Sequence, residues 1–400
     1  MRHEIINGDV LDGLRSLPDC SVQCVVTSPP YWGLRDYGVP GQIGLEPTLD
    51  EYVEKMVGVF REVWRVLRND GTVWLNLGDS YASARACGRR NVVGSGSLED
   101  GKRDAGPNRP VNGLREKNLV GIPWRVAFAL QADGWYLRSD IIWSKPNPMP
   151  ESVRDRPTKS HEYVFLLTKR PRYFYDADAV REKIGEPVRM AASFRDGGVY
   201  TNNRSYDNQG PRQKETHGDG DPSFVGRNRR TVWKIATQPT SEAHFATFPE
   251  ALVIPCIKAG TSERGCCPEC GAPWRRVVER EVTGIPHYNS KSKGRADCQY
   301  GESATTTLRA TARNAKTVCW QPSCTCDVAE TVPCVVLDPF GGSGTVAKVA
   351  RDLGRSSVMI ELNPEYVGIM KKRLRVGGQL DSDVNEIHVT SLPLTDGGVV

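Results

Sequence analysis

One stretch near the end of the chain, residues 335–366, constrains the fold more than any other. It reads VVLDPFGGSGTVAKVARDLGRSSVMIELNPEY. An apolar run is followed by a glycine-rich turn, a helical pattern, a second apolar run and, 20 residues after Gly341, the acid Glu361. This succession is typical of a nucleotide site, where glycines let a ligand approach the backbone and the distal carboxylate accepts hydrogen bonds from ribose hydroxyls.

The glycine-rich turn, FGGSGT, excludes two common nucleotide sites. It lacks the third glycine of the dinucleotide fingerprint at its usual spacing, and it lacks the Gly-Lys-Ser/Thr of a phosphate-binding loop. Asp338, which ends the first apolar run, would repel a pyrophosphate but suits a ligand that carries positive charge. S-adenosylmethionine, with an ammonium and a sulfonium group, fits that description.

A second informative stretch is VVTSPPYWGL, residues 25–34. Pro29 and Pro30 end an apolar strand because neither can donate to a sheet, and the first holds Ser28 extended. A rigid turn with a hydroxyl before it and Tyr31 and Trp32 after it can hold a flat ligand in a cleft. The same residues are also compatible with a strand-ending turn whose aromatic rings pack on the core.

The rest of the chain alternates strand and helix patterns. Residues 49–67 repeat apolar side chains at helical spacing, with Asp50 as the expected cap, and residues 71–79 read as a buried strand. A helix ended by Gly134 and strands at 136–145 and 162–169 follow. This alternation predicts an α/β fold with a parallel, doubly wound sheet.

Composition and charge narrow the class of protein. The chain has 400 residues, of which 38% are hydrophobic and 25% charged, which is typical of a soluble globular enzyme with two or three domains. There is neither an apolar run of bilayer length nor an apolar start like a secretory signal, so we expect a cytoplasmic protein without membrane contact. Residues 85–117 and 151–234 carry an excess of Lys and Arg, which suggests a polyanion partner, although long polar loops also collect arginines.

Cysteines cluster in one part of the sequence. Seven of the 12 lie between Cys266 and Cys326, which indicates a metal site rather than disulfides in this setting. Two close pairs can supply a tetrahedral sulfur site for structural zinc, with Cys319 or Cys266 as substitutes for one ligand, and the alternative is reduced surface thiols. The four predicted zinc ligands are Cys267, Cys270, Cys324 and Cys326.

The stretches DPFGGSGT and TSPPYW together closely resemble the two signature motifs of S-adenosylmethionine-dependent DNA amino-methyltransferases. The catalytic motif comes first in the chain, as in the circularly permuted beta group of bacterial and phage modification methylases. This resemblance implies a Rossmann-like seven-stranded sheet with one antiparallel strand. It covers roughly residues 1–84, 119–175, 238–260 and 333–375.

The resemblance also assigns site residues. Glu361 is expected to hold the ribose and Asp9 to lie near the adenine ring. The methionine end of the cofactor is expected to contact Asp338, Phe340, Gly341, Gly342, Ser343, Gly344 and Thr345. The expected catalytic residues are Ser28, Pro29, Pro30 and Tyr31.

These assignments imply a mechanism. The Ser28 hydroxyl and the Pro29 carbonyl accept the two amino hydrogens, which localises the nitrogen lone pair toward the sulfonium methyl group. The base must leave the DNA stack to reach this turn, and Tyr31 stacks on it. Trp32 either stacks as well or packs on the core, and His161 is expected to be structural.

Serine at the first motif position favours N4 of cytosine over N6 of adenine. An RNA methyltransferase and a catalytically silent zinc-containing DNA-binding module are the alternatives. We expect double-stranded DNA as the partner, and an associated restriction enzyme is not required for the activity.

The expected organisation follows from these patterns. Residues 1–176 form the catalytic part, with a basic loop at 85–118, and residues 332–385 form the cofactor-binding part. Between them we expect a target-recognition insert at 177–237, a cofactor-covering segment at 238–260 and a zinc-ribbon-like insert at 261–331. Residues 386–400 read as a polar tail.

Overall fold

The computed structural model describes residues 1–34, 36, 38–82, 114–182, 227–238, 248–283, 311–375 and 386–393. The chain divides into two compact units, each considered by itself. One comprises residues 1–180, 230–275 and 322–400, and the other comprises residues 181–229 and 276–321. Most of the expected basic loop and target-recognition insert, and the first part of the cofactor-covering segment, lie outside the described residues.

The first unit is built on one large sheet. In the part of the chain that the structure describes, this sheet has nine strands in the order β11-β1-β10-β9-β2-β3-β5-β4-β6. Their bounds are β1 Arg2–Asn7, β2 Val22–Thr27, β3 Leu67–Leu77, β4 Tyr136–Ser144, β5 His161–Thr168, β6 Val232–Lys234, β9 Val335–Asp338, β10 Ser356–Glu361 and β11 Glu386–Ser391.

Strand directions follow the predicted class. β5 pairs antiparallel with both β3 and β4, and the remaining pairings within this sheet are parallel. The seven neighbouring strands β1-β10-β9-β2-β3-β5-β4 therefore confirm the expected mostly parallel sheet with one antiparallel strand. β9 and β2 are neighbours from opposite ends of the chain, and from this pair the sheet is built outward in both directions. A ligand crevice is expected at such a switch point.

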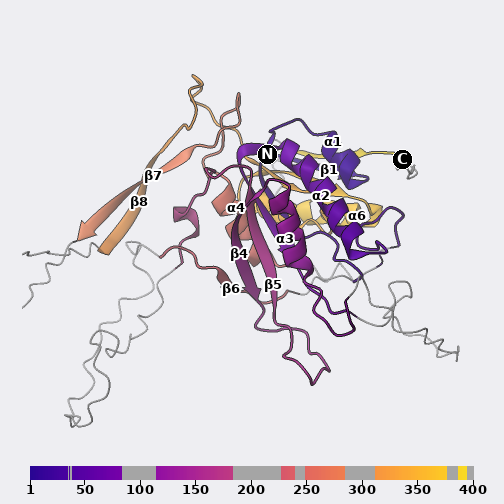
Figure 1. Cartoon of the computed structure of the whole chain (residues 1–400). Helices are drawn as coiled ribbons and strands as arrows, with labels where there is room; N and C mark the ends of the chain where they lie inside the picture. The colour runs from indigo at the N-terminus through magenta and orange to yellow at the C-terminus, as the bar shows by residue number, and fades with distance from the viewer. Residues whose placement is uncertain are drawn as a thin grey trace, which may run out of the picture. The chain divides into compact units, whose positions relative to one another are not determined.

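Helices cover both faces of this sheet (Figure 1), and the described residues form six of them. Apolar side chains alternate along the strands, so Ile6 and Val25 face one core while Ile5 and Cys24 face the other. The first core is closed by α1 Val10–Arg15, α2 Leu49–Val66 and α3 Ile122–Ala132, and the second by α4 Glu250–Gly260, α5 Thr345–Asp352 and α6 Pro364–Arg375.

The cap of α2 differs from the sequence prediction. Thr48, and not Asp50, is the N-cap, and its side chain accepts the backbone N–H of Glu51. Thr48 and Glu51 stand three residues apart, as in a capping box, which the sequence prediction overlooked. Asp50 lies in the first turn, where its negative charge favours the helix N-terminus.

Two edge strands fall inside segments that the sequence assigned otherwise. β6 lies within the expected target-recognition insert but pairs with β4, and β11 lies within the expected tail but pairs with β1. β6 has only three residues and β11 is largely exposed, so neither shows an alternating apolar pattern strong enough to predict a strand.

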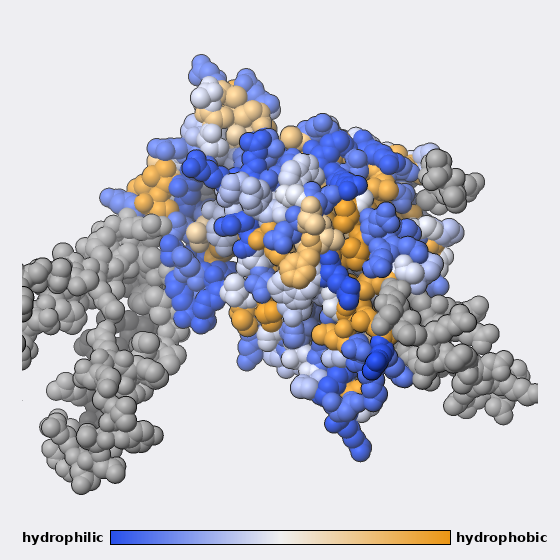
Figure 2. Space-filling model, in the orientation of Figure 1, coloured by the Kyte–Doolittle hydropathy of each residue, from blue (hydrophilic) through white to orange (hydrophobic). Residues whose placement is uncertain are grey.

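The second unit contains a two-stranded sheet of β7 Arg275–Thr283 and β8 Thr311–Gln321. Within it, the Arg276 guanidinium lies over the Trp320 ring, 4.4 Å from the ring centroid. A short 3-10 helix, η1 Asp178–Val180, belongs to the first unit. No helix among the described residues is long and apolar enough to cross a membrane. The face of the molecule in Figure 2 shows hydrophobic residues interspersed with hydrophilic ones.

Candidate active site and cysteine cluster

The sequence motifs meet at one edge of the large sheet. β2 ends just before Ser28, β9 ends at Asp338 and β10 ends at Glu361, so three parallel strands bring these residues to their common carboxyl edge. β5 runs the opposite way and therefore begins at this edge, where His161 is the register partner of Ser144 at the end of β4. The topology thus adds the start of β5 to the predicted site.

A cavity of about 680 Å³ lies at this edge. Its volume is within the range of cofactor sites. The cavity is lined by nearly all the predicted catalytic and cofactor residues: Asp9, Ser28, Pro29, Pro30, Tyr31, Phe340, Gly341, Gly342, Ser343, Thr345 and Glu361. Asp338 and Gly344 are not among its lining residues. Asp338 accepts the backbone N–H of Phe340, a lining residue, and Gly344 packs against Met370.

The predicted catalytic turn, Ser28 to Tyr31, is held from both sides. The Tyr52 hydroxyl donates to the Pro30 carbonyl at 2.9 Å, and the Tyr31 ring packs so closely on Gly78 that a Cβ there would meet it at 2.6 Å. Trp32 is only 6% exposed and donates its indole N–H to the Glu46 carbonyl. Of the two interpretations of Trp32, the structure therefore supports packing on the core.

Behind the turn lies a polar network that the sequence did not reveal. Asn76, near the end of β3, directs its Nδ2 toward Ser28 Oγ at 3.3 Å, Tyr31 Oη at 2.8 Å and Glu162 Oε2 at 2.9 Å. Glu162 also accepts the Tyr31 hydroxyl at 2.9 Å and pairs with the Lys145 ammonium at 2.5 Å. Asn76, Lys145 and Glu162 all line the cavity.

Protonation in this network follows from its contacts. Burial and the neighbouring Glu162 carboxylate raise the pKa of Tyr31 well above its usual value, so its hydroxyl stays a donor. Burial of Glu162 acts to raise its pKa, but Lys145, together with hydrogen bonds from Lys145, Asn76 and Tyr31, outweighs it and leaves the pKa below the usual value. Glu162 is therefore a carboxylate at neutral pH.

The predicted cofactor loop, residues 339–344, and the predicted catalytic turn are joined beneath the cavity. The Thr27 hydroxyl donates to Asp338 Oδ1 at 2.7 Å, and the Phe340 backbone N–H donates to the same oxygen at 3.0 Å. Burial raises the pKa of Asp338 to about 7, although both hydrogen bonds act to lower it. A cationic ligand above this carboxyl group would favour its ionised form.

Glu361 is oriented by the backbone around it. Its Oε2 accepts the Gly342 N–H at 2.7 Å and its Oε1 accepts the Asn363 N–H at 2.8 Å. Burial raises its pKa to about 7. Asn7, at the end of β1, donates to the Glu361 carbonyl at 2.8 Å and so fixes the strand end that carries the acid.

The remaining loop residues are supported by the helices behind them. Arg373 on α6 donates to the Ser343 hydroxyl at 2.7 Å and to the Thr345 hydroxyl at 3.1 Å. Gly344 has φ 77°, and a Cβ there would meet Met370 Cγ at 2.6 Å. Gly344 therefore has a conformational and packing role in the loop.

Two further predicted residues can be placed. Asp9 caps α1 by accepting the Leu11 N–H at 2.8 Å, and it lines the cavity. His161 does not line the cavity, and its ring lies edge-on to that of Tyr163 with the centroids 5.3 Å apart. The neighbouring Glu162 could have been found from the sequence as the acid at the start of an otherwise apolar strand.

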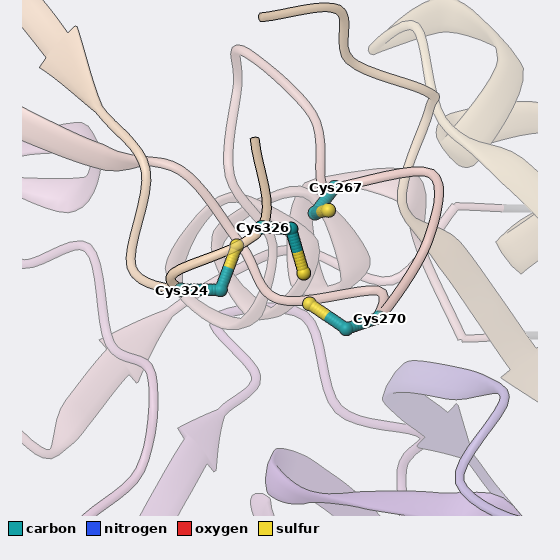
Figure 3. Close-up of side chains that lie close together, drawn as sticks. All are labelled: Cys267, Cys270, Cys324 and Cys326. Atoms are coloured by element: carbon teal, nitrogen blue, oxygen red, sulfur yellow. The ribbon is translucent and has the colours of Figure 1, made fainter. Parts of the chain in front are cut away.

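The four predicted zinc ligands lie together. The Sγ atoms of Cys267, Cys270, Cys324 and Cys326 all lie within 4.8 Å of one another, and their side chains converge (Figure 3). In a tetrahedral zinc site with Zn–S bonds of about 2.3 Å, the sulfur atoms are about 3.8 Å apart, so the four sulfur atoms are close enough together to hold one metal ion. The Cys270 backbone N–H, bonded to the Cys267 sulfur, helps to lower the pKa of Cys267 to about 7.

The cysteine cluster is anchored to the opposite edge of the sheet from the cavity. Gln23, at the start of β2, donates to the Gly271 carbonyl at 3.2 Å and accepts the Val335 N–H of β9 at 2.7 Å. Arg68 on β3 donates to the Cys270 carbonyl. The cluster therefore lies near the beginnings of strands whose ends form the cavity.

Comparison with known proteins gives one consistent family. The family model described as DNA methylase matches residues 22–267 and 334–372. The chain is 38% identical to Type II methyltransferase M.Cfr9I of Citrobacter freundii over 97% of this chain and 91% of that protein. It is 40% identical to M.XycI of Xanthomonas campestris pv. cyanopsidis over 93% of this chain and 87% of that protein.

A solved structure supports the fold. PvuII DNA methyltransferase, named as cytosine-N4-specific, matches with a TM-score of 0.50 at 16% identity, over 96% of this chain and 90% of that chain. At this identity the likeness shows the fold alone. The family match and the relatives of nearly full length show that the chain belongs to the DNA methylase family of S-adenosylmethionine-dependent amino-methyltransferases, which modify N4 of cytosine or N6 of adenine.

Proposed function

We propose that this protein transfers the methyl group of S-adenosylmethionine to N4 of a cytosine that has been flipped out of double-stranded DNA, within a specific recognition sequence. The observation that carries the proposal is the shared cavity, which is lined both by the Ser28 to Tyr31 turn and by the Gly341 to Ser343 loop. A methyl donor and its acceptor must meet in one such space for direct transfer.

The lining of the cavity suits the cofactor. Gly341 and Gly342 let a ligand approach the loop backbone, and Glu361 faces the same space with its carboxylate already oriented. Asp338 is held under the loop, where its charge favours a ligand with an ammonium group. When bound, S-adenosylmethionine supplies an electrophilic methyl group.

The residues of the turn act on the amino group. Its nitrogen is a poor nucleophile because the lone pair is delocalised into the base ring. The Ser28 hydroxyl and the Pro29 carbonyl accept the amino hydrogens, and Tyr52 holds the turn in place through the Pro30 carbonyl. Acceptors fixed in this way need no reorganisation as charge develops on the nitrogen.

Cytosine is the proposed base because serine stands at position 28, which among the related methylases is more usual in enzymes that modify N4 of cytosine. N6 of adenine is the second outcome that the experiment below distinguishes. The inserts around 85–118 and 177–237, rich in Arg and amide side chains, are proposed to contact DNA phosphates and base edges.

We also propose that Cys267, Cys270, Cys324 and Cys326 bind one structural Zn²⁺. The four thiols match a tetrahedral sulfur site in number and spacing. Because the cluster is anchored at the strand beginnings by Gln23 and Arg68, the metal is assigned to fold stability rather than to methyl transfer.

Expression in a host whose own DNA methylation is known tests the function. Sequencing that detects modified bases should find N4-methylcytosine at one recurrent motif, and the Pro29→Ala variant should lose it. N6-methyladenine at one motif would replace the cytosine assignment. An unmodified genome, together with purified protein that does not methylate DNA, would contradict the proposal.

A further inference from the structure

Glu162 is a nearly buried acid that the mechanism above does not use. Its side chain is 14% exposed, it lies at the start of β5, and it lines the cavity beside the catalytic turn. Three residues from three different elements surround its carboxylate: Tyr31 after β2, Asn76 on β3 and Lys145 after β4. This many partners fix both the position and the charge of the carboxylate.

A continuous path of hydroxyl groups joins this acid to the reacting centre. Ser28 Oγ lies 3.3 Å from Tyr31 Oη, and the Tyr31 hydroxyl donates to Glu162 Oε2 at 2.9 Å. Since Tyr31 keeps its proton and directs it to Glu162, its oxygen can accept the Ser28 hydroxyl. The path then runs in one direction, from Ser28, which accepts an amino hydrogen of the base, to Glu162.

Methyl transfer creates a proton that must leave. When the amino nitrogen forms its bond to the methyl carbon and the sulfonium bond breaks, the nitrogen becomes positively charged and still carries both hydrogens. One of them must be released to give the neutral methylated base. A serine hydroxyl alone is too weak a base to keep this proton, so Ser28 must pass one on.

We propose that Glu162 is a positioning residue that accepts this proton through Tyr31 and Ser28. The N–H bond breaks as the proton moves to Ser28 Oγ, the Ser28 proton moves to Tyr31 Oη, and the Tyr31 proton moves to Glu162 Oε2. The three transfers leave both hydroxyl groups as they began and convert the carboxylate into a carboxylic acid, which later releases the proton to solvent.

The ion pair with Lys145 suits this role. The Lys145 ammonium lies 4.3 Å from the centroid of the Trp143 ring and holds Glu162 Oε1, which leaves Oε2 for Tyr31 and Asn76. A carboxylate with little solvent contact also stabilises positive charge that develops on the nearby amino nitrogen, because screening is weak there.

The inference rests on the proposed function. It is tested with the full-length enzyme and an unmethylated duplex oligonucleotide that carries the motif which the enzyme methylates. Glu162→Gln keeps the size of the side chain but removes the proton acceptor. We expect kcat to fall about 100-fold, which is within the range of general base catalysis, while KM for DNA and the Kd of S-adenosylmethionine stay unchanged. Glu162→Asp, which keeps the charge, should recover part of the loss.

Tyr31→Phe provides a second test that leaves Glu162 in place. It should also lower kcat, and the double variant should be no slower than the slower single variant, because both changes break the same path. Additive losses would indicate that Glu162 acts only by holding Lys145, and would overturn the relay. A wild-type kcat in either single variant would overturn it as well.

Asp133→Asn is the matched control for loss of an ion pair. Asp133 is 18% exposed, pairs with Arg61 and does not line the cavity, so kcat should be unchanged. If the wild-type enzyme methylates DNA but Glu162→Gln is equally fast, the relay is wrong and the proposed function stands. If the wild-type enzyme does not methylate DNA, the proposed function itself fails.

Discussion

Thr27 and Asp338 lie 311 positions apart in the chain, yet a 2.7 Å hydrogen bond joins the Thr27 hydroxyl to the Asp338 carboxyl group. Thr27 directly precedes the catalytic turn, and Asp338 directly precedes the cofactor loop. This contact fixes the spacing of the two cavity walls where the first and last parts of the chain meet.

Thr27→Val should therefore weaken cofactor binding. The valine keeps the shape of the side chain but removes one of the two hydrogen-bond donors to the buried Asp338 and leaves the Phe340 N–H, which should cost about 1 to 3 kcal/mol of folding free energy. We expect the Kd of S-adenosylmethionine, measured by calorimetry, to rise about tenfold, as for a loss of about 1.4 kcal/mol. Thr168→Val, at a buried threonine that does not line the cavity, should lose stability without a change in Kd.

Cofactor affinity should depend on pH near neutrality. Burial raises the pKa of Asp338 and of Glu361 to about 7, so both carboxyl groups ionise between pH 6 and 8. A cationic ligand prefers the ionised forms, and each group can weaken binding by up to about tenfold at pH 6 relative to pH 8. Calorimetry at pH 6, 7 and 8 measures this, and Asp338→Asn should reduce the slope; equal affinity at all three values would refute the assignment.

The same shifts fix the sign of the pH dependence of stability. For an acid whose folded pKa is raised, the folded protein binds more protons than the unfolded chain, so stability falls as pH rises from the ordinary carboxyl value toward 7. Without cofactor, the free energy of unfolding measured with urea should decrease over this window. Saturating cofactor should restore the free energy of unfolding at the upper end of this pH window. A free energy of unfolding that rises with pH because of Asp338 and Glu361 would contradict the prediction.

Removal of the metal should make the protein easier to unfold, without a direct effect on the methyl-transfer step. With free zinc at a thousand times its Kd, binding contributes about 4 kcal/mol of stability, which a chelator or Cys270→Ser should remove. Elemental analysis should find one zinc per chain in the wild type. Cys20→Ser, at an exposed cysteine outside the cluster, should keep both zinc and stability, and a fully metal-free wild type would exclude the site.

Two glycines allow a matched test of the cofactor loop. Gly344→Ala should destabilise the protein by about 2 kcal/mol or more, because φ is 77° and the new Cβ would overlap Met370. Gly368→Ala, inside α6 with open space around it, should instead stabilise by about 0.5 to 1 kcal/mol. Urea unfolding of both variants measures the difference, and equal effects would show that the loop relaxes freely.

The sequence predicted the parts of the site that lie within one continuous motif. The loop after Asp338 and the turn after Thr27 could be found because glycines, prolines and apolar runs stand at fixed local spacings. Glu162 and Lys145 were missed because they join the site only through the pairing of β3, β5 and β4, and the antiparallel direction of β5 decides which of its ends lies at the cavity. The edge strands were missed because backbone pairing alone, without an alternating apolar pattern, defines them.

The position of β1 in the sheet has a consequence for synthesis of the protein. Its two neighbours, β10 and β11, begin at Ser356 and Glu386, so β1 pairs with strands that are synthesised long after it. Contacts of such long sequence separation form slowly, and β1, whose Ile5 and Ile6 are buried in the finished sheet, stays unpaired until both neighbours have been made. β1 is thus open to mispairing until β10 and β11 have been made.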